Sequence, residues 1–151
     1  MDPMTFQITI DCAAPAELAK FWATALHYDL APPPPGFESW HGWYRSVGVP
    51  EEELAGEPDS PDRIVDPAGV GPKFWFQQVP ETKSVKNRLH LDLDVSGGRA
   101  QPLPERRAVV EAEVARLCAA GASIFRVNDD AANGQFGVVM RDPEGNEFCV
   151  S

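Results

Sequence analysis

The stretch HLDLDV, residues 90–95, decides the fold, because QITIDC at residues 7–12 overlays it without a gap. In both stretches polar and apolar side chains alternate, which is typical of a β-strand with one buried face. With the apolar residues that precede them, the predicted strands run from Phe6 to Cys12 and from Leu89 to Val95. Two such similar strands in distant parts of one chain indicate an internal repeat.

A helix is predicted after each of these strands. In both segments apolar residues recur every three or four positions, and a proline, Pro15 or Pro104, stands where a first helical turn begins. We therefore predict helices over about 15–27 and 105–120. Gly121 follows the second helix as a ready C-terminal cap.

The rest of each half also follows one pattern. Short strands are predicted at 74–79, 124–127, 136–141 and 147–150. The last strand of each half follows a DPxG turn, DPAG at 66–69 and DPEG at 142–145. Each half is therefore predicted to contain, in this order, a strand, a helix, further strands, a turn and a final strand.

Three segments lie outside this pattern. The prolines at 32–35 predict a stiff polyproline corner, and the acidic stretch 50–61 predicts an exposed loop. The aromatic segment Trp40–Tyr44 has a strand-like pattern. Its aromatic area exceeds what one small core needs, which favours a homodimer.

The composition sets limits on the class of protein. A chain of 151 residues with 43% hydrophobic and 24% charged residues is typical of one globular domain. The net charge of −10 argues against nucleic acid as a partner, and no apolar run is long enough to predict a membrane helix. The three widely spaced cysteines, with no signal-peptide pattern, favour reduced thiols and a cytoplasmic location.

Four motifs, taken in this order and spacing, resemble the glyoxalase-like domains of the vicinal oxygen chelate superfamily. They are FQITIDC at 6–12, LAKFW at 18–22, KNRLHLD at 86–92 and DPEGNEF at 142–148. The resemblance covers nearly the whole chain. It implies an α+β fold, a single domain over 1–151 in which two βαβββ modules, about 5–80 and 87–151, form an eight-stranded open barrel around a small-molecule site.

The resemblance does not imply one activity. The superfamily includes metal-dependent lyases, isomerases, epimerases, ring-cleaving dioxygenases, thiol transferases and metal-free drug-binding proteins, so the fold alone leaves the chemistry open. We predict a metal-free protein that binds or transforms a small organic metabolite. A metal-dependent lyase or isomerase of glyoxalase type and a drug-sequestering resistance protein are the alternatives.

For metal-dependent members, the resemblance implies a His or Gln on each opening strand and a Glu on each closing strand. Gln7 and His90 stand at the opening positions. The closing position of the second half, four residues after Gly145, is Cys149, and Glu147 stands two residues earlier on the same face. An equally good interpretation of His90 is a hydrogen bond to Asp92 or to a neighbouring strand.

The closing strand of the first half contains no acid, and the ligand position falls on Phe76 or Gln77. Amides are weak neutral ligands, whereas a hard octahedral site requires carboxylate and water oxygens. We therefore expect no cofactor. The alternative is a divalent metal whose candidate ligands are Gln7, His90 and Glu147.

The polar faces of the strands supply the candidate catalytic residues His90, Asp92, Asp11 and Asp94. Asp11 and Asp94 are equivalent in the repeat, and two carboxylates brought close together raise one pKa and form an acid/base pair. His90 beside Asp92 is a second candidate proton carrier. The alternative interpretation is that these aspartates are only solvated.

The candidate ligand-binding residues are those placed on the polar face or in aromatic segments: Gln7, Thr9, Trp40, Trp43, Phe76, Gln77, Arg88 and Cys149. The aromatic ones would form an apolar wall for a flat ligand, and Arg88 would hold an anionic group. Core packing of the aromatic residues and solvation of Arg88 are the alternatives.

Overall fold

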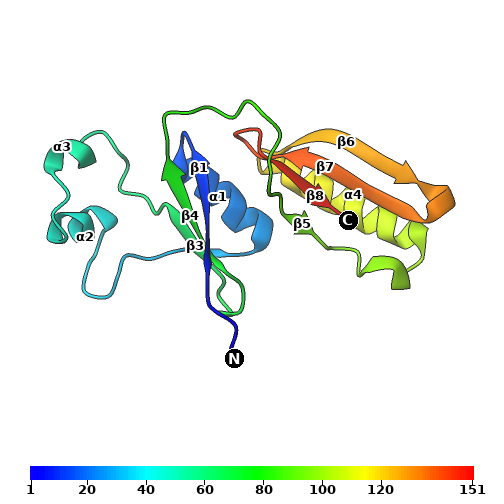
Figure 1. Cartoon of the computed structure of the whole chain (residues 1–151), viewed down its shortest axis with the longest axis horizontal. Helices are drawn as coiled ribbons and strands as arrows, with labels where there is room; N and C mark the ends of the chain where they lie inside the picture. Colours follow the sequence, from blue (N-terminus) through cyan, green and yellow to red (C-terminus); the bar gives the residue numbers. More distant parts are fainter. The chain divides into compact units, whose positions relative to one another are not determined.

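Both predicted opening strands fold into sheets in the computed structural model, which describes residues 1–151 (Figure 1). The chain divides into an N-terminal unit, Met1–Glu81, and a C-terminal unit, Thr82–Ser151. Each unit holds one four-stranded sheet, and in both sheets the strands lie in the order first, fourth, third, second. The two units therefore share one topology, in agreement with the repeated sequence pattern.

The sheet of the N-terminal unit is built from β1 (Gln7–Cys12), β2 (Asp29–Leu30), β3 (Arg63–Val65) and β4 (Lys73–Gln78). β1 runs parallel to β4, while β3 is antiparallel to both β4 and β2. The helix α1 (Pro15–Leu26) contacts β3 and β4 and buries Leu18. With Ile64 and Phe76, this side chain forms the fully buried part of the core.

The C-terminal unit repeats this arrangement with β5 (Asp92–Leu93), β6 (Ser123–Asp130), β7 (Gln135–Arg141) and β8 (Glu147–Val150). The long helix α4 (Leu103–Ala119) contacts β6, β7 and β8, and Figure 1 shows it running along this sheet. Two short 3-10 helices, Gly98–Ala100 and Ala131–Asn133, complete the unit. Its fully buried side chains are Val110, Leu117, Met140, Phe148 and Val150.

Both DPxG turns have the predicted geometry. The N–H of Gly69 donates to the Asp66 carbonyl and that of Gly145 to the Asp142 carbonyl, each at 2.9 Å. Both glycines have positive φ, 69° and 87°, which a side chain would disfavour. The Asp66 and Asp142 carboxylates also accept backbone N–H groups of their own turns, so each aspartate fixes the approach to a closing strand.

The prediction of a strand at Trp40–Tyr44 is wrong, because this segment is the helix α2 (Trp40–Ser46). The side chain of Ser39 caps it by accepting the Gly42 N–H at 3.0 Å. Trp40, Trp43 and Tyr44 then follow helical spacing, which alternation of apolar residues over so short a stretch does not reveal. The loop predicted at 50–61 likewise contains one helical turn, α3 (Glu51–Leu54).

The strand predicted over Leu89–Val95 is much shorter than expected. Only Asp92 and Leu93 pair in the sheet, with Cys149 and Val150 of β8, and Leu89 is 88% exposed. The α+β class with a strand–helix–three-strand order in each unit is confirmed. None of the helices has the length and apolar character that crossing a bilayer requires.

Candidate functional site

A pocket of about 520 Å³ opens within the N-terminal unit. Its walls come from the start of α1, from α2 and α3, and from the strand β4 with the segment that leads into β3. The aromatic and acidic side chains of the lining include Trp40, Tyr44, Glu53, Glu57, Asp62 and Trp75. A ligand pocket of this size with aromatic walls and a few polar groups is typical of small-molecule sites.

The aromatic wall of the pocket is carried by α2. The ring centroids of Trp40 and Tyr44 lie 6.0 Å apart, and Trp43 packs against both of these rings. The Trp40 indole nitrogen donates to the Ala31 carbonyl at 3.1 Å, so this nearly buried side chain is fixed at both ends. The wall is therefore ordered by packing and by a hydrogen bond before any ligand enters.

Asp62 joins the aromatic residues of two different elements. Its carboxylate accepts hydrogen bonds from the Trp75 indole nitrogen at 3.0 Å and from the Tyr44 hydroxyl at 3.3 Å. It also pairs with the guanidinium of Arg63 at 2.8 Å. Burial raises the pKa of the Tyr44 hydroxyl and the Asp62 charge acts in the same direction, while Arg63 opposes both. Tyr44 is therefore a neutral hydrogen-bond donor at physiological pH.

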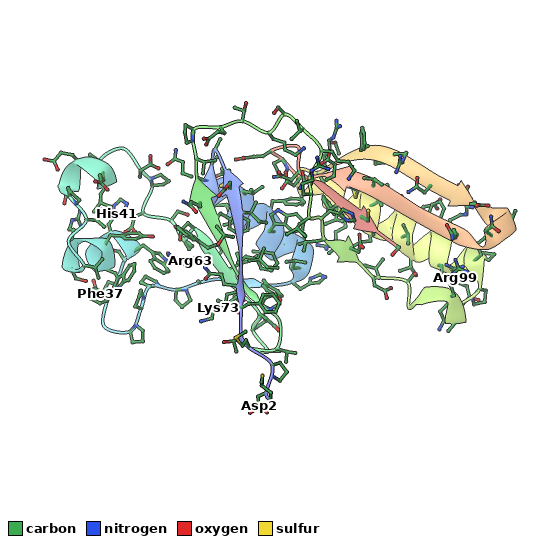
Figure 2. The ribbon with its side chains drawn as sticks, in the orientation of Figure 1. Asp2, Phe37, His41, Arg63, Lys73 and Arg99 are labelled. Carbon is green, nitrogen blue, oxygen red and sulfur yellow. The ribbon has the colours of Figure 1, made fainter.

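Arg63 is held between two of the tryptophans. Its guanidinium carbon lies 4.9 Å from the ring centroid of Trp40 and 5.5 Å from that of Trp75. Figure 2 shows Arg63 beside the ribbon of the N-terminal sheet, with His41 on α2. Asp62, Arg63 and the two indoles thus form one connected support for the pocket wall.

A second group of reactive side chains lies in the C-terminal unit. His90, Asp92 and Cys149 each bring one donor atom to within 4.8 Å of the others. His90 Nδ1 lies 3.0 Å from Asp92 Oδ1. Burial raises the pKa of the Cys149 thiol, and the hydrogen bond to Asp92 and the charge of this carboxylate raise it further. Cys149 is accordingly a protonated thiol near neutral pH and a poor nucleophile.

Glu147 lies on the same strand but is engaged elsewhere. Its carboxylate accepts the Asn87 N–H at 3.1 Å and pairs with Lys83 Nζ at 3.1 Å. Burial raises the pKa of Glu147, but these two partners outweigh it and lower the pKa to about 2. The side chain is 8% exposed and holds the loop ahead of β5 through these two contacts, so its carboxylate is already engaged.

The residues do not fit the four-ligand metal centre that the resemblance implies. Asp92 pairs with Cys149 in the second sheet, and the equivalent pair in the first sheet is Thr9 with Trp75. The closing position of the first unit is therefore Trp75, not Phe76 or Gln77, and an indole cannot supply a carboxylate. The donors His90, Asp92 and Cys149 form a softer set, of the kind that zinc accepts.

The pocket includes only some of the residues proposed from the sequence. Trp40, Phe76 and Gln77 line it, although Phe76 is otherwise fully buried in the core. Of the other candidates, Gln7, Thr9, Trp43 and Asp11 belong to the same unit but do not line the pocket, and His90, Asp92, Asp94, Arg88 and Cys149 belong to the C-terminal unit. The proposed pairing of Asp11 with Asp94 joins residues of different units and stays a prediction.

Sequence reasoning missed several polar and aromatic pocket residues: Tyr44, Asp62, Trp75, Glu17, Glu53 and Glu57. The spacing of Trp40, Trp43 and Tyr44, read as a helix after Ser39, would have pointed to the aromatic wall. Asp62 carries no sequence signal, because its role depends on partners that lie 13 and 18 residues away.

Several proteins of known structure have a similar fold. A glyoxalase/bleomycin resistance protein/dioxygenase family enzyme from Burkholderia phytofirmans is 15% identical, with a TM-score of 0.56 over 95% of this chain and 94% of that chain. A mutant form of the fosfomycin resistance protein FosX from Listeria monocytogenes, complexed with Mn(II), is 9% identical, with a TM-score of 0.56 over 99% and 90%. TioX from Micromonospora is 14% identical, with a TM-score of 0.50 over 98% and 97%.

At these identities the likeness concerns the fold alone. A search with the sequence finds no match among curated proteins. The family model of the glyoxalase-like domain, however, matches residues 7–151, which is nearly the whole chain. This chain therefore belongs to the glyoxalase-like domain family.

Proposed function

We propose that this protein binds a small organic molecule in the pocket of the N-terminal unit, without the four-ligand metal centre of its metal-dependent relatives. The observation that carries the proposal is the pocket itself, about 520 Å³ in volume and walled by Trp40, Tyr44 and Trp75. The hydrogen bonds of Asp62 order this wall in advance, so a ligand would meet little entropic cost in arranging it.

The comparisons support binding of a small molecule in general terms. The structures of similar fold include proteins described as fosfomycin resistance proteins and as members of a bleomycin resistance family. The absence of a carboxylate at Trp75 supports the metal-independent form of the proposal. Once a ligand has been found, the protein is incubated with it and the mixture is analysed for product. Product formation means that the molecule is transformed, and its absence means that the molecule is sequestered.

The proposal is tested by blocking the pocket. A library of small organic fragments is screened by thermal shift, since a ligand that binds only the folded state raises the melting temperature. Ser60 lines the pocket, and Ser60→Phe should fill it and abolish the shifts. Ser84→Phe, at an exposed position of the other unit, is the matched control and should leave them intact. Shifts that survive Ser60→Phe would contradict the proposal.

A second candidate function is catalysis that uses the C-terminal cluster. The contact of 3.0 Å between His90 Nδ1 and Asp92 Oδ1 orients the imidazole as a general base would require. On this hypothesis His90→Ala would abolish turnover of a bound compound and leave its affinity unchanged. Asp94, in the same unit, remains a candidate for the same proton transfer.

A further inference from the structure

We infer that the pocket of the N-terminal unit selects flat organic cations over neutral and anionic molecules of the same shape. This inference rests on the proposed function, because it names the class of molecule that the same pocket takes. It is carried by two features of the lining that are independent of each other: the sign of its charged side chains and the aromatic character of its wall.

The charged side chains that line the pocket are all acidic except for the imidazole of His41. They are Glu17, Glu53, Glu57 and Asp62, and no lysine or arginine is among the lining residues. Two of these carboxylates already have cationic partners, because Asp62 pairs with Arg63 at 2.8 Å and Glu17 with Lys20 at 2.9 Å. Glu53 and Glu57 have no ion-pair partner in the structure, and both are exposed at the pocket wall, where solvent screens their charges in part.

The aromatic wall favours the same class of molecule. The faces of tryptophan and tyrosine rings carry negative potential and attract cations. The protein already uses this chemistry with one of its own side chains, since the Arg63 guanidinium lies over Trp40 and Trp75 with Asp62 as its counterion. Arg63 already occupies the Asp62 carboxylate, and Trp40 is buried. A flat cation would therefore use the accessible ring surface of Tyr44 and Trp75, with Glu53 and Glu57 as its carboxylates.

The geometry strengthens the preference. Carboxylates beside low-dielectric walls concentrate their field in a pocket, which draws in cations and repels anions. Glu53 belongs to α3 and Glu57 to the turn after it, whereas the aromatic wall belongs to α2 and β4. A planar ring stacked on the wall would therefore keep its positive charge within the field of these glutamates.

Three compounds with one ring system separate charge from shape: N-methylacridinium, acridine and acridine-9-carboxylate, measured at about pH 8, where acridine is neutral. Binding is followed by isothermal titration calorimetry on the full chain and by the Trp75 indole N–H signal in NMR spectra. We expect the cation to bind about tenfold more tightly than acridine and the carboxylate not to bind. Equal affinity for acridine and its cation, or tighter binding of the carboxylate, would overturn the inference.

Variants of the glutamates test the source of the selectivity. Glu53→Gln with Glu57→Gln should lower the affinity for N-methylacridinium about tenfold and leave acridine unchanged. Glu52→Gln is the matched control, because Glu52 lies on the same helical turn but does not line the pocket. A loss that is the same for cation and neutral compound would overturn the inference as well.

The two proposals fail in different ways. If neutral fragments bind in the pocket and N-methylacridinium does not, the charge inference is wrong and the proposed function stands. If neither the three acridines nor any fragment moves the Trp75 signal, both are overturned.

Discussion

The indole nitrogen of Trp75 donates a hydrogen bond to the Asp62 carboxylate at 3.0 Å, and this bond ties the pocket face of β4 to the segment that enters β3. Trp75 stands where the repeat places Cys149 in the other unit. A position that would carry a metal ligand in metal-dependent relatives thus carries an aromatic side chain that shapes a pocket.

Breaking the contact between Trp75 and Asp62 should destabilise the N-terminal unit. Asp62→Ala removes the oxygens that accept from Trp75 and Tyr44 and that pair with Arg63, and we expect it to lower the free energy of unfolding by about 2–3 kcal/mol. Trp75→Phe removes only the indole donor and most of one ring. In a double-mutant cycle measured by urea unfolding, the two changes should show a coupling energy of about 1 kcal/mol. Strict additivity would contradict the contact.

Glu147 should make stability depend on pH in the acid range. Its pKa is lowered from 4.5 to about 2, so its contribution is fully present above pH 4.5 and is lost as the pH falls toward 2. Glu147→Gln should therefore cost about 2–3 kcal/mol of unfolding free energy at pH 7, with a loss that shrinks below pH 4.5. Glu38→Gln, at an exposed position of the N-terminal unit, is the control and should be neutral at all pH values. A deficit of Glu147→Gln that stayed constant between pH 7 and 3 would contradict this assignment.

The thiol of Cys149 should react slowly with alkylating reagents. Its pKa is raised by burial and by Asp92, which lowers the fraction of reactive thiolate, and its sulfur is less exposed than that of Cys118. Mass spectrometry of iodoacetamide labelling should show Cys118 modified first. Asp92→Asn removes the negative charge beside the sulfur and should accelerate labelling of Cys149 and not of Cys118. Labelling of Cys149 ahead of Cys118 would be the contrary result.

The purified, untagged chain should hold no stoichiometric manganese, nickel or zinc after dialysis. Trp75 and the engagement of Glu147 with Lys83 leave the four-ligand centre without its carboxylates. Elemental analysis measures this directly. Stoichiometric metal that is lost with His90→Ala would show that His90, Asp92 and Cys149 supply a centre of their own, and the lyase alternative would then be preferred.

The aromatic segment Trp40–Tyr44 does not supply the exposed surface from which a homodimer was predicted. The aromatic residues of Trp40–Tyr44 face their own unit, where Trp40 is 7% exposed, so they do not offer a large exposed surface. Exposed apolar side chains instead gather on the edge strand β6, at Ile124, Phe125 and Val127. Sedimentation velocity at tens of micromolar should still give a dimer that Val127→Glu weakens, and a wild-type monomer would contradict the prediction.

Much of the fold was predictable from local sequence patterns. The helical stripes located α1 and α4 to within two residues, and the two DPxG turns located the closing strands. These features depend on neighbours in the sequence. The strand predicted at 89–95 was too long: Leu91 and Val95 still hydrogen-bond to Cys149 and Ser151, but only Asp92 and Leu93 have paired partners in β8. The partner strand decides where pairing stops, and the alternation alone does not show this.

The candidate site was less predictable for a physical reason. The alternation of polar and apolar residues correctly placed Gln7 and Thr9 on the polar face of β1, where both are exposed. It could not show that α2 and α3 would bring Tyr44 and Glu53 to the same pocket as Trp75. Such a pocket depends on how a 32-residue connection between β2 and β3 folds back onto β4, counted from Ala31 to Asp62, and no short-range pattern encodes this.

The central claim is that the pocket of the N-terminal unit binds a small molecule, and a titration followed by tryptophan indole N–H signals tests it most directly. The tryptophans provide their own control, because Trp40 and Trp75 line the pocket while Trp22, a residue of α1, is buried in the core. A bound fragment should shift the Trp75 signal and leave that of Trp22 unchanged. Shifts confined to the C-terminal unit around His90, with Trp40 and Trp75 unmoved, would contradict the account.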